Sequence, residues 1–303
     1  MELAIMIEGQ NGLNWQNLER IAQAVEELGY TALYRSDHIT NSQPPDQPSL
    51  DCWASLAWLA TNTRSIQFGP LVSPVSMHHP VNIARMARDI DDLSAGRLQL
   101  GLGAGWLERE HRNYSFDLLG IKQRFNRFRE ALEIITKLFR SEAPLNFTGQ
   151  YYRLEDAVLL PRPQRPGGPH LVIGGRGLNH TPQMVADYAD EWNIFRVSPQ
   201  TLAVLLGKLE HILQERGRSI QDIRRSLMVN IILGEDDADL REKMAGKPLV
   251  EWREKGLVGT PAQIVDQIGE YAALGIQRLI LQQFCPDDLS TIEKVAARIL
   301  PQV

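Results

Sequence analysis

Two neighbouring side chains near the start of the chain, Asp37 and His38, have the chemistry needed for proton transfer. They follow the segment TALYR, whose composition is typical of a buried strand. Histidine has the ordinary pKa closest to neutrality, so His38 could give or take a proton during turnover. The alternative is structural: Asp37 caps the following loop and His38 only bonds to backbone. Position alone leaves both interpretations open.

A second candidate is the glycine-rich segment around Arg176. Gly174, Gly175 and Gly177 surround this arginine directly after the apolar segment HLVI. Backbone N–H groups in such a loop can approach an anion closely, and a guanidinium adds a planar positive fork. The alternative is a tight turn that simply needs glycine. We favour an anion site, because an arginine among glycines serves a turn poorly.

The segment WLEREHRNY, which follows GLGAG, is a third candidate. Trp106 could form a wall for a planar ring, and Arg109 or Arg112 could meet a phosphate. The same segment is equally typical of a solvent-exposed helix start. Its function therefore depends on what lies beside it.

Other reactive patterns have less support. His78 and His79 precede Pro80, but a metal site typically needs about three or four converging ligands, and no H-x-H or H-E-x-x-H pattern occurs. We predict a structural role for them and no metal. Cys52 and Cys285 are far apart in the sequence and are expected to be core thiols. The chain has no G-x-S-x-G and no P-loop, which disfavours acyl and phosphoryl transfer.

A parallel sheet must position these residues. Eight apolar runs of strand length each precede a segment with helical spacing of apolar residues, in a chain of 303 residues. This predicts an α/β fold, a (β/α)8 TIM barrel, with its chemistry at the carboxyl ends of the strands. A doubly wound sheet is the alternative, but the GLGAG run has Trp106 where the dinucleotide motif needs its last glycine.

Two segments interrupt the strand–helix order, so we expect one domain, 1–303, with insertions after strands four and seven. Segment 141–169 has alternating aromatic and polar residues and then four prolines. We interpret it as a small hairpin that lies over the strand ends and walls the pocket. Segment 234–259 is charged and is expected to be mainly helical.

The composition limits the partners. The chain is 43% hydrophobic and 23% charged, with a net charge of −5, which gives no field favouring nucleic acid or anionic lipid. The start, MELAIMIEG, lacks the basic and long apolar regions of a signal peptide, and no apolar run is long enough to span a membrane. We therefore expect a cytoplasmic protein that acts on a small molecule.

Motifs along almost the whole chain resemble one known family. They are SDHI, GPLVSPVSMHHP, GRLQLGLGAGWLEREHRNYSFDL, RFNRFREALEII, FTGQYY, LVIGG, ADYADEWN and GLVGTPAQIVDQI, in that order. Together they resemble the bacterial luciferase-like monooxygenase superfamily, and more closely its branch that uses the deazaflavin coenzyme F420.

The resemblance implies a barrel whose mouth holds a flavin or deazaflavin ring. Asp37 and His38 would lie near the ring, with His38 as the proton donor or acceptor. A bulge, which in some members contains a non-proline cis peptide, would support one ring face at the end of strand three. It maps to the backbone of Gly69, Pro70, Leu71 and Val72, with Pro70–Leu71 as the candidate cis bond.

The resemblance also implies that the phosphate-bearing tail runs to the loops after strands four and five. Gly174, Gly175 and Arg176 match the tail-binding turn, and Trp106 and Arg109 would border the cofactor. Trp106 stands where the sugar-phosphate dehydrogenase branch has glutamate, which argues against that substrate.

The expected function is F420-dependent hydride transfer to or from a small organic substrate. An FMN-dependent monooxygenase on the same barrel is the alternative. A second alternative is a flavin-binding relative without its own reaction, against which the presence of His38 counts. Apolar helix faces often pair subunits in such barrels, so a homodimer is the expected assembly.

Overall fold

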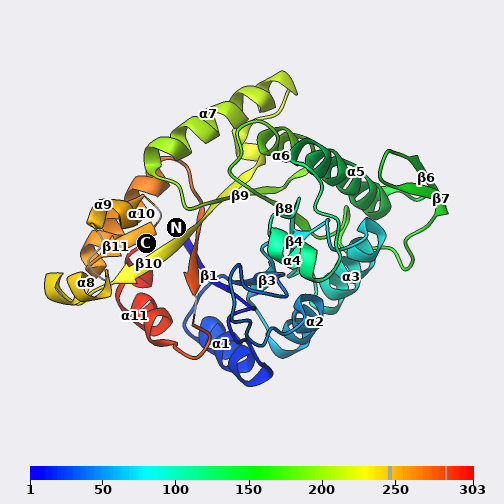
Figure 1. Cartoon of the computed structure of the whole chain (residues 1–303). Coiled ribbons are helices and arrows are strands. Elements are labelled where there is room, and N and C mark those ends of the chain that lie inside the picture. The colour runs from blue at the N-terminus through cyan, green and yellow to red at the C-terminus, as the bar shows by residue number, and fades with distance from the viewer. Residues whose placement is uncertain (245–247, 255, 284) are drawn as a thin grey trace.

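Parallel strands form a barrel that is closed by one interrupted strand (Figure 1). The computed structural model describes residues 1–244, 248–254, 256–283 and 285–303. The order of paired strands is β3-β2-β1-β12-β10-β9-β8-β5-β4. Since β3 and β4 are two halves of the same stretch of chain, the two ends of this order meet. The predicted TIM barrel is confirmed. Its strands are β1 (Glu2–Ile7), β2 (Ala32–Arg35), β3 (Gln67–Pro70), β4 (Ser73–Pro74), β5 (Gln99–Gly103), β8 (His170–Gly174), β9 (Glu191–Phe195), β10 (Arg224–Leu233) and β12 (Arg278–Gln283).

Helices surround the barrel and bury one apolar face each (Figure 1). Proline at the first turn begins several of them; α7, for example, starts at Pro199, and the Ser198 side chain accepts a hydrogen bond from the Thr201 N–H. None of the described helices is long and apolar enough to cross a membrane. The outer helices are α1 (Trp15–Glu27), α2 (Cys52–Asn62), α3 (Pro80–Leu93), α5 (Ile121–Arg140), α6 (Thr181–Tyr188), α7 (Pro199–Glu215), α10 (Pro261–Ala273) and α11 (Ser290–Arg298), with short helices α4 (Glu108–Asn113), η1 (Ile220–Asp222) and η2 (Leu300–Gln302).

The interior of the barrel is filled by side chains. Arg278 at the start of β12 is fully buried and binds the carboxylates of Glu2 at 2.9 Å and Glu191 at 3.2 Å. Above this ionic layer lies an apolar cluster that includes Met6 and Ile280. Because the interior is packed, a ligand must bind at the mouth, beyond the carboxyl ends of the strands.

The strand between β3 and β4 is interrupted at a non-proline cis peptide bond. This bond joins Leu71 to Val72. The sequence pointed to Pro70–Leu71, so the predicted position was wrong by one residue. Proline fixes only its own φ angle, and the turn into β4 falls one peptide later.

The main chain at this interruption packs against glycines of the neighbouring strands. A Cβ atom on Gly101 would lie 2.0 Å from the carbonyl oxygen of Pro70. The Val72 side chain fills space that Cβ atoms on Gly103 and Gly174 would occupy, at 2.5 and 2.7 Å. The glycines of β5 and β8 thus let the interrupted strand close the barrel.

The first insertion is a hairpin of β6 (Leu145–Thr148) and β7 (Arg153–Ala157). The Glu130 carboxylate of α5 accepts hydrogen bonds from the backbone of Gln150 and Tyr151. Farther on, Arg165 pairs with Asp91 of α3 at 2.9 Å. The hairpin therefore packs on the outside of α3 and α5 (Figure 1), and the prediction that it covers the strand ends and walls the pocket is wrong.

The second insertion contains α8 (Asp237–Lys243) and α9 (Leu249–Arg253). It ends in a strand, β11 (Gly256–Gly259), which pairs in parallel with the last residues of β10. Residues 245–247 and 255 of the predicted insertion lie outside the described residues. The expected helical segment thus also adds a short strand beside the barrel.

We predict that Gly101→Ala lowers the free energy of unfolding by roughly 1–3 kcal/mol, because the added Cβ collides with backbone that cannot rotate away. The control is Gly207→Ala in α7, where an added Cβ meets nothing within 4 Å. The control should gain up to about 1 kcal/mol from helix propensity. Urea unfolding measures both, and equal stability of the two variants would contradict the role given to Gly101.

Candidate functional site

His38 lies at the mouth of the barrel, and a buried carboxylate holds its ring. The His38 Nδ1 lies 3.1 Å from Glu110 Oε2, and Glu110 in α4 is 1% exposed. The other Glu110 oxygen accepts hydrogen bonds from the backbone N–H groups of Ile39 and Thr40. Trp106 packs edge-on against the ring, with centroids 5.6 Å apart. Glu110 thus fixes both the imidazole and the loop that carries it.

The surroundings of His38 favour its protonated form. Burial alone would lower the pKa of the imidazole, but the hydrogen bond and the charge of Glu110 outweigh it. The carboxylates of Glu8 and Asp37 add to this effect, and the pKa is raised above its ordinary value. His38 is therefore suited to hold a proton near neutral pH and to release it to a bound molecule.

Asp37 faces a different set of partners. Its Oδ2 atom accepts hydrogen bonds from Ser73 Oγ at 2.6 Å and from His78 Nε2 at 2.9 Å. Burial opposes ionisation of Asp37, but the hydrogen bond and charge of His78 and the Ser73 hydroxyl lower the pKa below its ordinary value. Asp37 therefore ties the end of β2 to β4 and to the loop before α3.

The predicted ring support is the stretch Gly69 to Val72. Gly69 and Pro70 belong to β3, and Leu71 and Val72 form the link to β4. The Leu71 N–H donates to the Arg35 carbonyl at 2.8 Å, and the Leu71 side chain packs into the barrel interior. The main chain of Leu71 and Val72 therefore lies at the mouth. It follows β3, which pairs with β2, the strand that leads into His38.

The glycine-rich turn after β8 is held in place by its neighbours. Trp192 Nε1 donates to the Gly175 carbonyl at 2.8 Å, and Gly175 has a φ of 150°. The Arg176 guanidinium lies 4.9 Å from the centroid of the Phe195 ring, and its Nη1 donates to the Arg196 carbonyl at 3.2 Å. Arg176 is exposed, so this turn can meet an anionic group.

Arg109 is engaged elsewhere. Its guanidinium binds both carboxylate oxygens of Asp46, at 2.7 and 2.6 Å, and donates to the Asn41 carbonyl at 2.8 Å. These partners belong to the loop after β2, so Arg109 anchors that loop over α4. The structure does not bring Arg109 together with Arg176, and the two arginines do not form one phosphate site.

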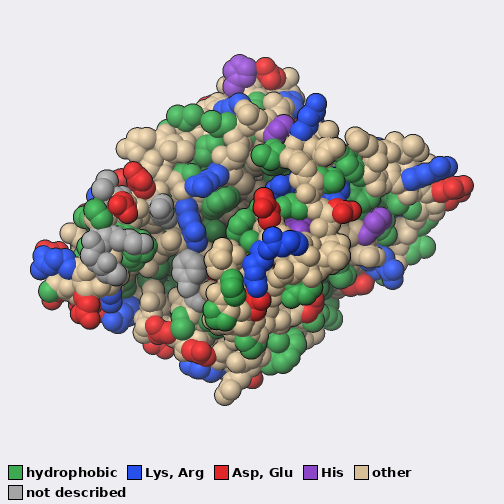
Figure 2. Space-filling view, viewed as in Figure 1, with side chains coloured by type: hydrophobic (Ala, Val, Ile, Leu, Met, Phe, Trp, Pro, Cys, Tyr) green, Lys and Arg blue, Asp and Glu red, His purple; other side chains and the backbone are tan. Residues whose placement is uncertain are grey.

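The chemistry of these groups fits a flavin or deazaflavin. The main chain of Leu71 and Val72 offers an uncharged surface, His38 offers a proton, and Arg176 offers a cation for an anionic tail. Acidic, basic and hydrophobic side chains are interspersed on the face shown in Figure 2, without a patch of one charge. Among the described residues, no group of three or more His, Cys, Asp or Glu could hold a metal ion.

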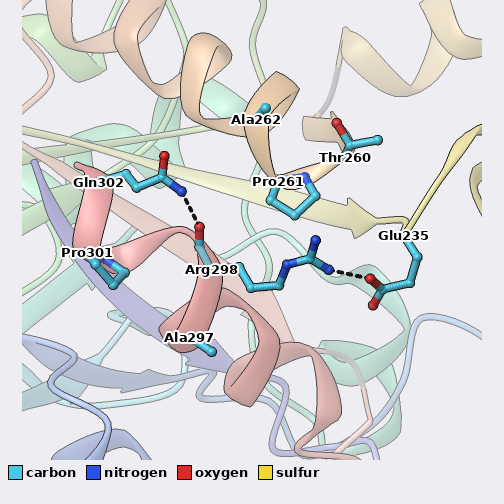
Figure 3. Close-up of a pocket in the computed structure, with 8 residues that line it drawn as sticks. All are labelled: Glu235, Thr260, Pro261, Ala262, Ala297, Arg298, Pro301 and Gln302. Atoms are coloured by element: carbon cyan, nitrogen blue, oxygen red, sulfur yellow. Dashed lines mark hydrogen bonds and ion pairs between the residues drawn. The ribbon is translucent and has the colours of Figure 1, made fainter.

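A separate pocket of about 480 Å³ lies between the start of α10 and the end of α11 (Figure 3). Arg298 crosses it to pair with Glu235, and Lys294 pairs with the same carboxylate. The rest of the lining is largely small or proline side chains, such as Pro261 and Ala297. Its charged groups, Glu235 and Arg298, are paired with each other, so we do not assign the chemistry to this pocket.

The family model for luciferase-like monooxygenases matches residues 1–256 of this chain. The chain belongs to the luciferase-like monooxygenase family. This confirms the resemblance predicted from the sequence.

Several luciferase-like relatives have F420 in their names. The chain is 30% identical over 222 residues to the F420-dependent hydroxymycolic acid dehydrogenase of Mycobacterium tuberculosis, covering 73% of this chain but only 60% of that protein. It is 30% identical over 230 residues to the F420-dependent glucose-6-phosphate dehydrogenase of Kineococcus radiotolerans, covering 74% and 66%. It is also 28% identical over 261 residues to the 4-hydroxyprotoasukamycin monooxygenase of Streptomyces nodosus, covering 82% and 67%.

A solved structure superposes over the full length of the chain. An F420-dependent secondary alcohol dehydrogenase in complex with an F420-acetone adduct has a TM-score of 0.87, at 16% identity and with coverage of 100% and 99%. At this identity the likeness supports the fold alone.

Several polar groups at the mouth of the barrel were not predicted from the sequence. Glu110 lies in the segment chosen for its tryptophan and arginines, and an acidic residue in a short helix after a strand was the available signal. Glu8 and Gln282 were missed although each lies at or just after a strand end. Arg196 follows β9 directly, next to Phe195, over whose ring the Arg176 guanidinium lies.

We predict that Glu110→Gln lowers the pKa of His38, because the neutral amide no longer stabilises the imidazolium. The pH dependence of the imidazole NMR signals measures this. The control is Asp46→Asn, which removes the exposed carboxylate paired with Arg109 and should leave the His38 pKa unchanged.

The same substitution changes how stability depends on pH. A folded-state pKa above the unfolded value, about 6.5, means that the His38–Glu110 pair stabilises the protein fully below that pH and loses this effect as pH rises through the folded pKa. The stability difference between wild type and Glu110→Gln should therefore be larger in mildly acidic buffer than in alkaline buffer. A difference that does not vary with pH would contradict the pairing.

Proposed function

We propose that this protein is an F420-dependent oxidoreductase that transfers a hydride to or from a small organic substrate. The observation that carries the proposal is the His38–Glu110 pair, a proton carrier with a raised pKa placed beside the main-chain surface of Leu71 and Val72. F420, when bound, supplies or accepts the hydride. The relatives with F420 in their names support this choice.

The side chains and main chain of the protein would supply the proton transfer and the positioning. His38 Nε2 delivers a proton to the substrate oxygen when a carbonyl is reduced, and takes it back when an alcohol is oxidised. Glu110 stabilises the charged imidazole and keeps Nδ1 occupied, so the proton moves at the other nitrogen. Trp106, which packs edge-on against His38, would border the bound ring. The main chain of Leu71 and Val72 would support one face of the ring.

The tail of the cofactor would run to the turn after β8. The backbone of Gly174 and Gly175 forms this turn, and Arg176 would offer a positive charge to a phosphate there. Asp37 takes part only through Ser73 and His78, by holding the ring support in place.

An FMN-dependent monooxygenase is the second candidate. The Streptomyces nodosus relative, which is a monooxygenase by name, favours it, and FMN also has a tricyclic ring and a phosphate. A flavin-binding protein without a reaction of its own is the third candidate. The raised pKa of His38 counts against it, because a passive binder has no use for a half-buried proton carrier.

The proposal extends to organisation and location. We regard residues 1–303 as one domain with insertions at 141–169 and 234–259, in a cytoplasmic protein. We also propose a homodimer. The exposed Trp15 of α1, whose ring contacts Trp58 of α2 at 6.4 Å, supports an apolar contact surface on these helices.

We predict that the purified protein binds F420 more tightly than FMN. Side-by-side titration by fluorescence and calorimetry measures the two dissociation constants. Tight FMN binding without measurable F420 binding would replace the first candidate by the second, and binding of neither would reject both.

We predict that His38→Ala lowers kcat by about 10²–10⁴-fold, the usual contribution of a positioned acid or base, and leaves cofactor affinity nearly unchanged. The control is His211→Ala, because His211 lies exposed on α7. Turnover of a carbonyl or alcohol substrate by the F420-loaded enzyme is the measurement. Unaltered kcat in His38→Ala would remove His38 from the chemistry.

A further inference from the structure

The short helix α4 carries Glu110 but is too short to hold its own position. It has six residues, and its N-cap residue, Leu107, makes no side-chain capping hydrogen bond. Isolated helices shorter than about 12 residues are marginal in water, because the first turn costs more free energy than it gains. Contacts with the rest of the protein must therefore fix α4, and with it the distance from Glu110 to His38.

One of these contacts joins His111 of α4 to Ser76. His111 Nε2 lies 2.7 Å from Ser76 Oγ, and both side chains are buried. Nδ1 of the same ring lies 2.7 Å from the Leu107 carbonyl oxygen. A carbonyl oxygen only accepts, so Nδ1 carries a hydrogen, and Nε2 of the neutral ring accepts a hydrogen bond from the Ser76 hydroxyl. The imidazole thus ties α4 to the segment between β4 and α3.

The main chain that leads into α4 packs against this hydrogen-bonded pair. A Cβ atom on Gly105 would lie 2.0 Å from Ser76 Oγ and 3.4 Å from His111 Nε2. Close packing of Gly105 opposes a shift of α4 toward Ser76, and the hydrogen bond opposes a shift away from it. The position of α4 is therefore defined from this side.

The Ser76–His111 contact completes a closed circuit of three loops at the mouth. The three side-chain contacts of the circuit are Asp37 with His78 at 2.9 Å, Ser76 with His111 at 2.7 Å and Glu110 with His38 at 3.1 Å. Each contact begins on the segment where the previous one ends, since their members are adjacent or two residues apart in the chain. The circuit runs from the loop after β2 to the segment before α3, then to α4, and back to the loop after β2.

We propose that Ser76 and His111 are positioning residues for His38, because their hydrogen bond holds α4 where Glu110 reaches the imidazole. Their importance for turnover rests on the proposed function, whereas the positioning itself can be tested without it. The interaction of two charges weakens with distance, so a small displacement of α4 reduces the effect of Glu110 on His38.

The first test measures the His38 pKa by NMR titration of the full chain without cofactor. The His38 signals are identified by their absence in His38→Ala. We expect Ser76→Ala to lower this pKa, but by less than Glu110→Gln does. In a Glu110→Gln background, Ser76→Ala should leave the His38 pKa unchanged, because its effect passes through the Glu110 carboxylate.

The matched control is Tyr30→Phe, which removes another buried hydroxyl. Tyr30 precedes β2, at the opposite end of the barrel from the mouth, and its hydroxyl donates to the Ile292 carbonyl at 2.7 Å. This variant should be less stable in urea but keep the His38 pKa of the wild type. The proposal is overturned if folded Ser76→Ala leaves that pKa unchanged, or lowers it equally in both backgrounds.

Two variants of His111 test the same contact without changing Ser76. An asparagine amide reaches about as far as Nδ1, so His111→Asn can keep the bond to the Leu107 carbonyl but loses Ser76. A glutamine amide reaches about as far as Nε2, so His111→Gln can keep the bond to Ser76. We expect the His38 pKa to be lowered in His111→Asn and to stay near the wild-type value in His111→Gln. Equal pKa values in the two variants, or the opposite order, would overturn the positioning role.

Turnover tests the link to the proposed function. We expect Ser76→Ala to lower kcat of the F420-loaded enzyme by up to about 10²-fold, the cost of a small misplacement, with nearly unchanged cofactor affinity. A wild-type kcat combined with a lowered His38 pKa would overturn the role in turnover. A protein that binds FMN or no ring contradicts the F420 assignment, but the His38 titration of the free chain still decides the positioning.

Discussion

The buried carboxylate of Asp37 is the interaction on which the mouth of the barrel depends. One of its oxygens accepts hydrogen bonds from the Ser73 hydroxyl and the His78 imidazole. Ser73 begins the half-strand that completes the barrel, directly after the Leu71–Val72 link, and His78 belongs to the loop before α3. A carboxylate kept ionised while buried imposes strict directions on its donors, because an unpaired charge there would be strongly destabilising. Barrel closure, ring support and loop position are thus set by one group.

Asp37 and His38 are adjacent in the chain, but their side chains point in opposite directions and contact different partners. Successive side chains of an extended chain point to opposite sides. Asp37 therefore meets β4 and His78, whereas His38 meets Glu110 on α4, which lies 72 residues later in the chain. What reads as one acid–base pair in the sequence is two carboxylate–histidine pairs in the structure. The Asp37–His78 pair ties β2 to the loop before α3, and the His38–Glu110 pair ties the loop after β2 to α4.

Much of the fold is predictable from the sequence, because a repeating strand–helix pattern is a local property. The placement of Pro80 and Pro199 at helix starts is also local and therefore also predictable. The strand-end location of His38 and Arg176 follows from the same pattern. Contacts such as Gln282 with Glu8 are not predictable in this way, since they join residues 274 apart and depend on strand order. The hairpin of 145–157 was recognisable as non-helical, but its side of the barrel is decided by Glu130 and Arg165, whose partners are remote in sequence.

The ring support at Leu71 and Val72 has a consequence for how this protein tolerates change. A surface made of main chain does not depend on which side chain stands at position 71, provided that the side chain still fits the interior. The restriction passes instead to Gly101, Gly103 and Gly174, where any Cβ would collide with the link or with the Val72 side chain. Amino-acid substitutions should therefore be tolerated better at the link itself than at the glycines of β5 and β8. The sequence constraint imposed by the ring support is then found on the neighbouring strands, at glycines that pack against Pro70 and Val72.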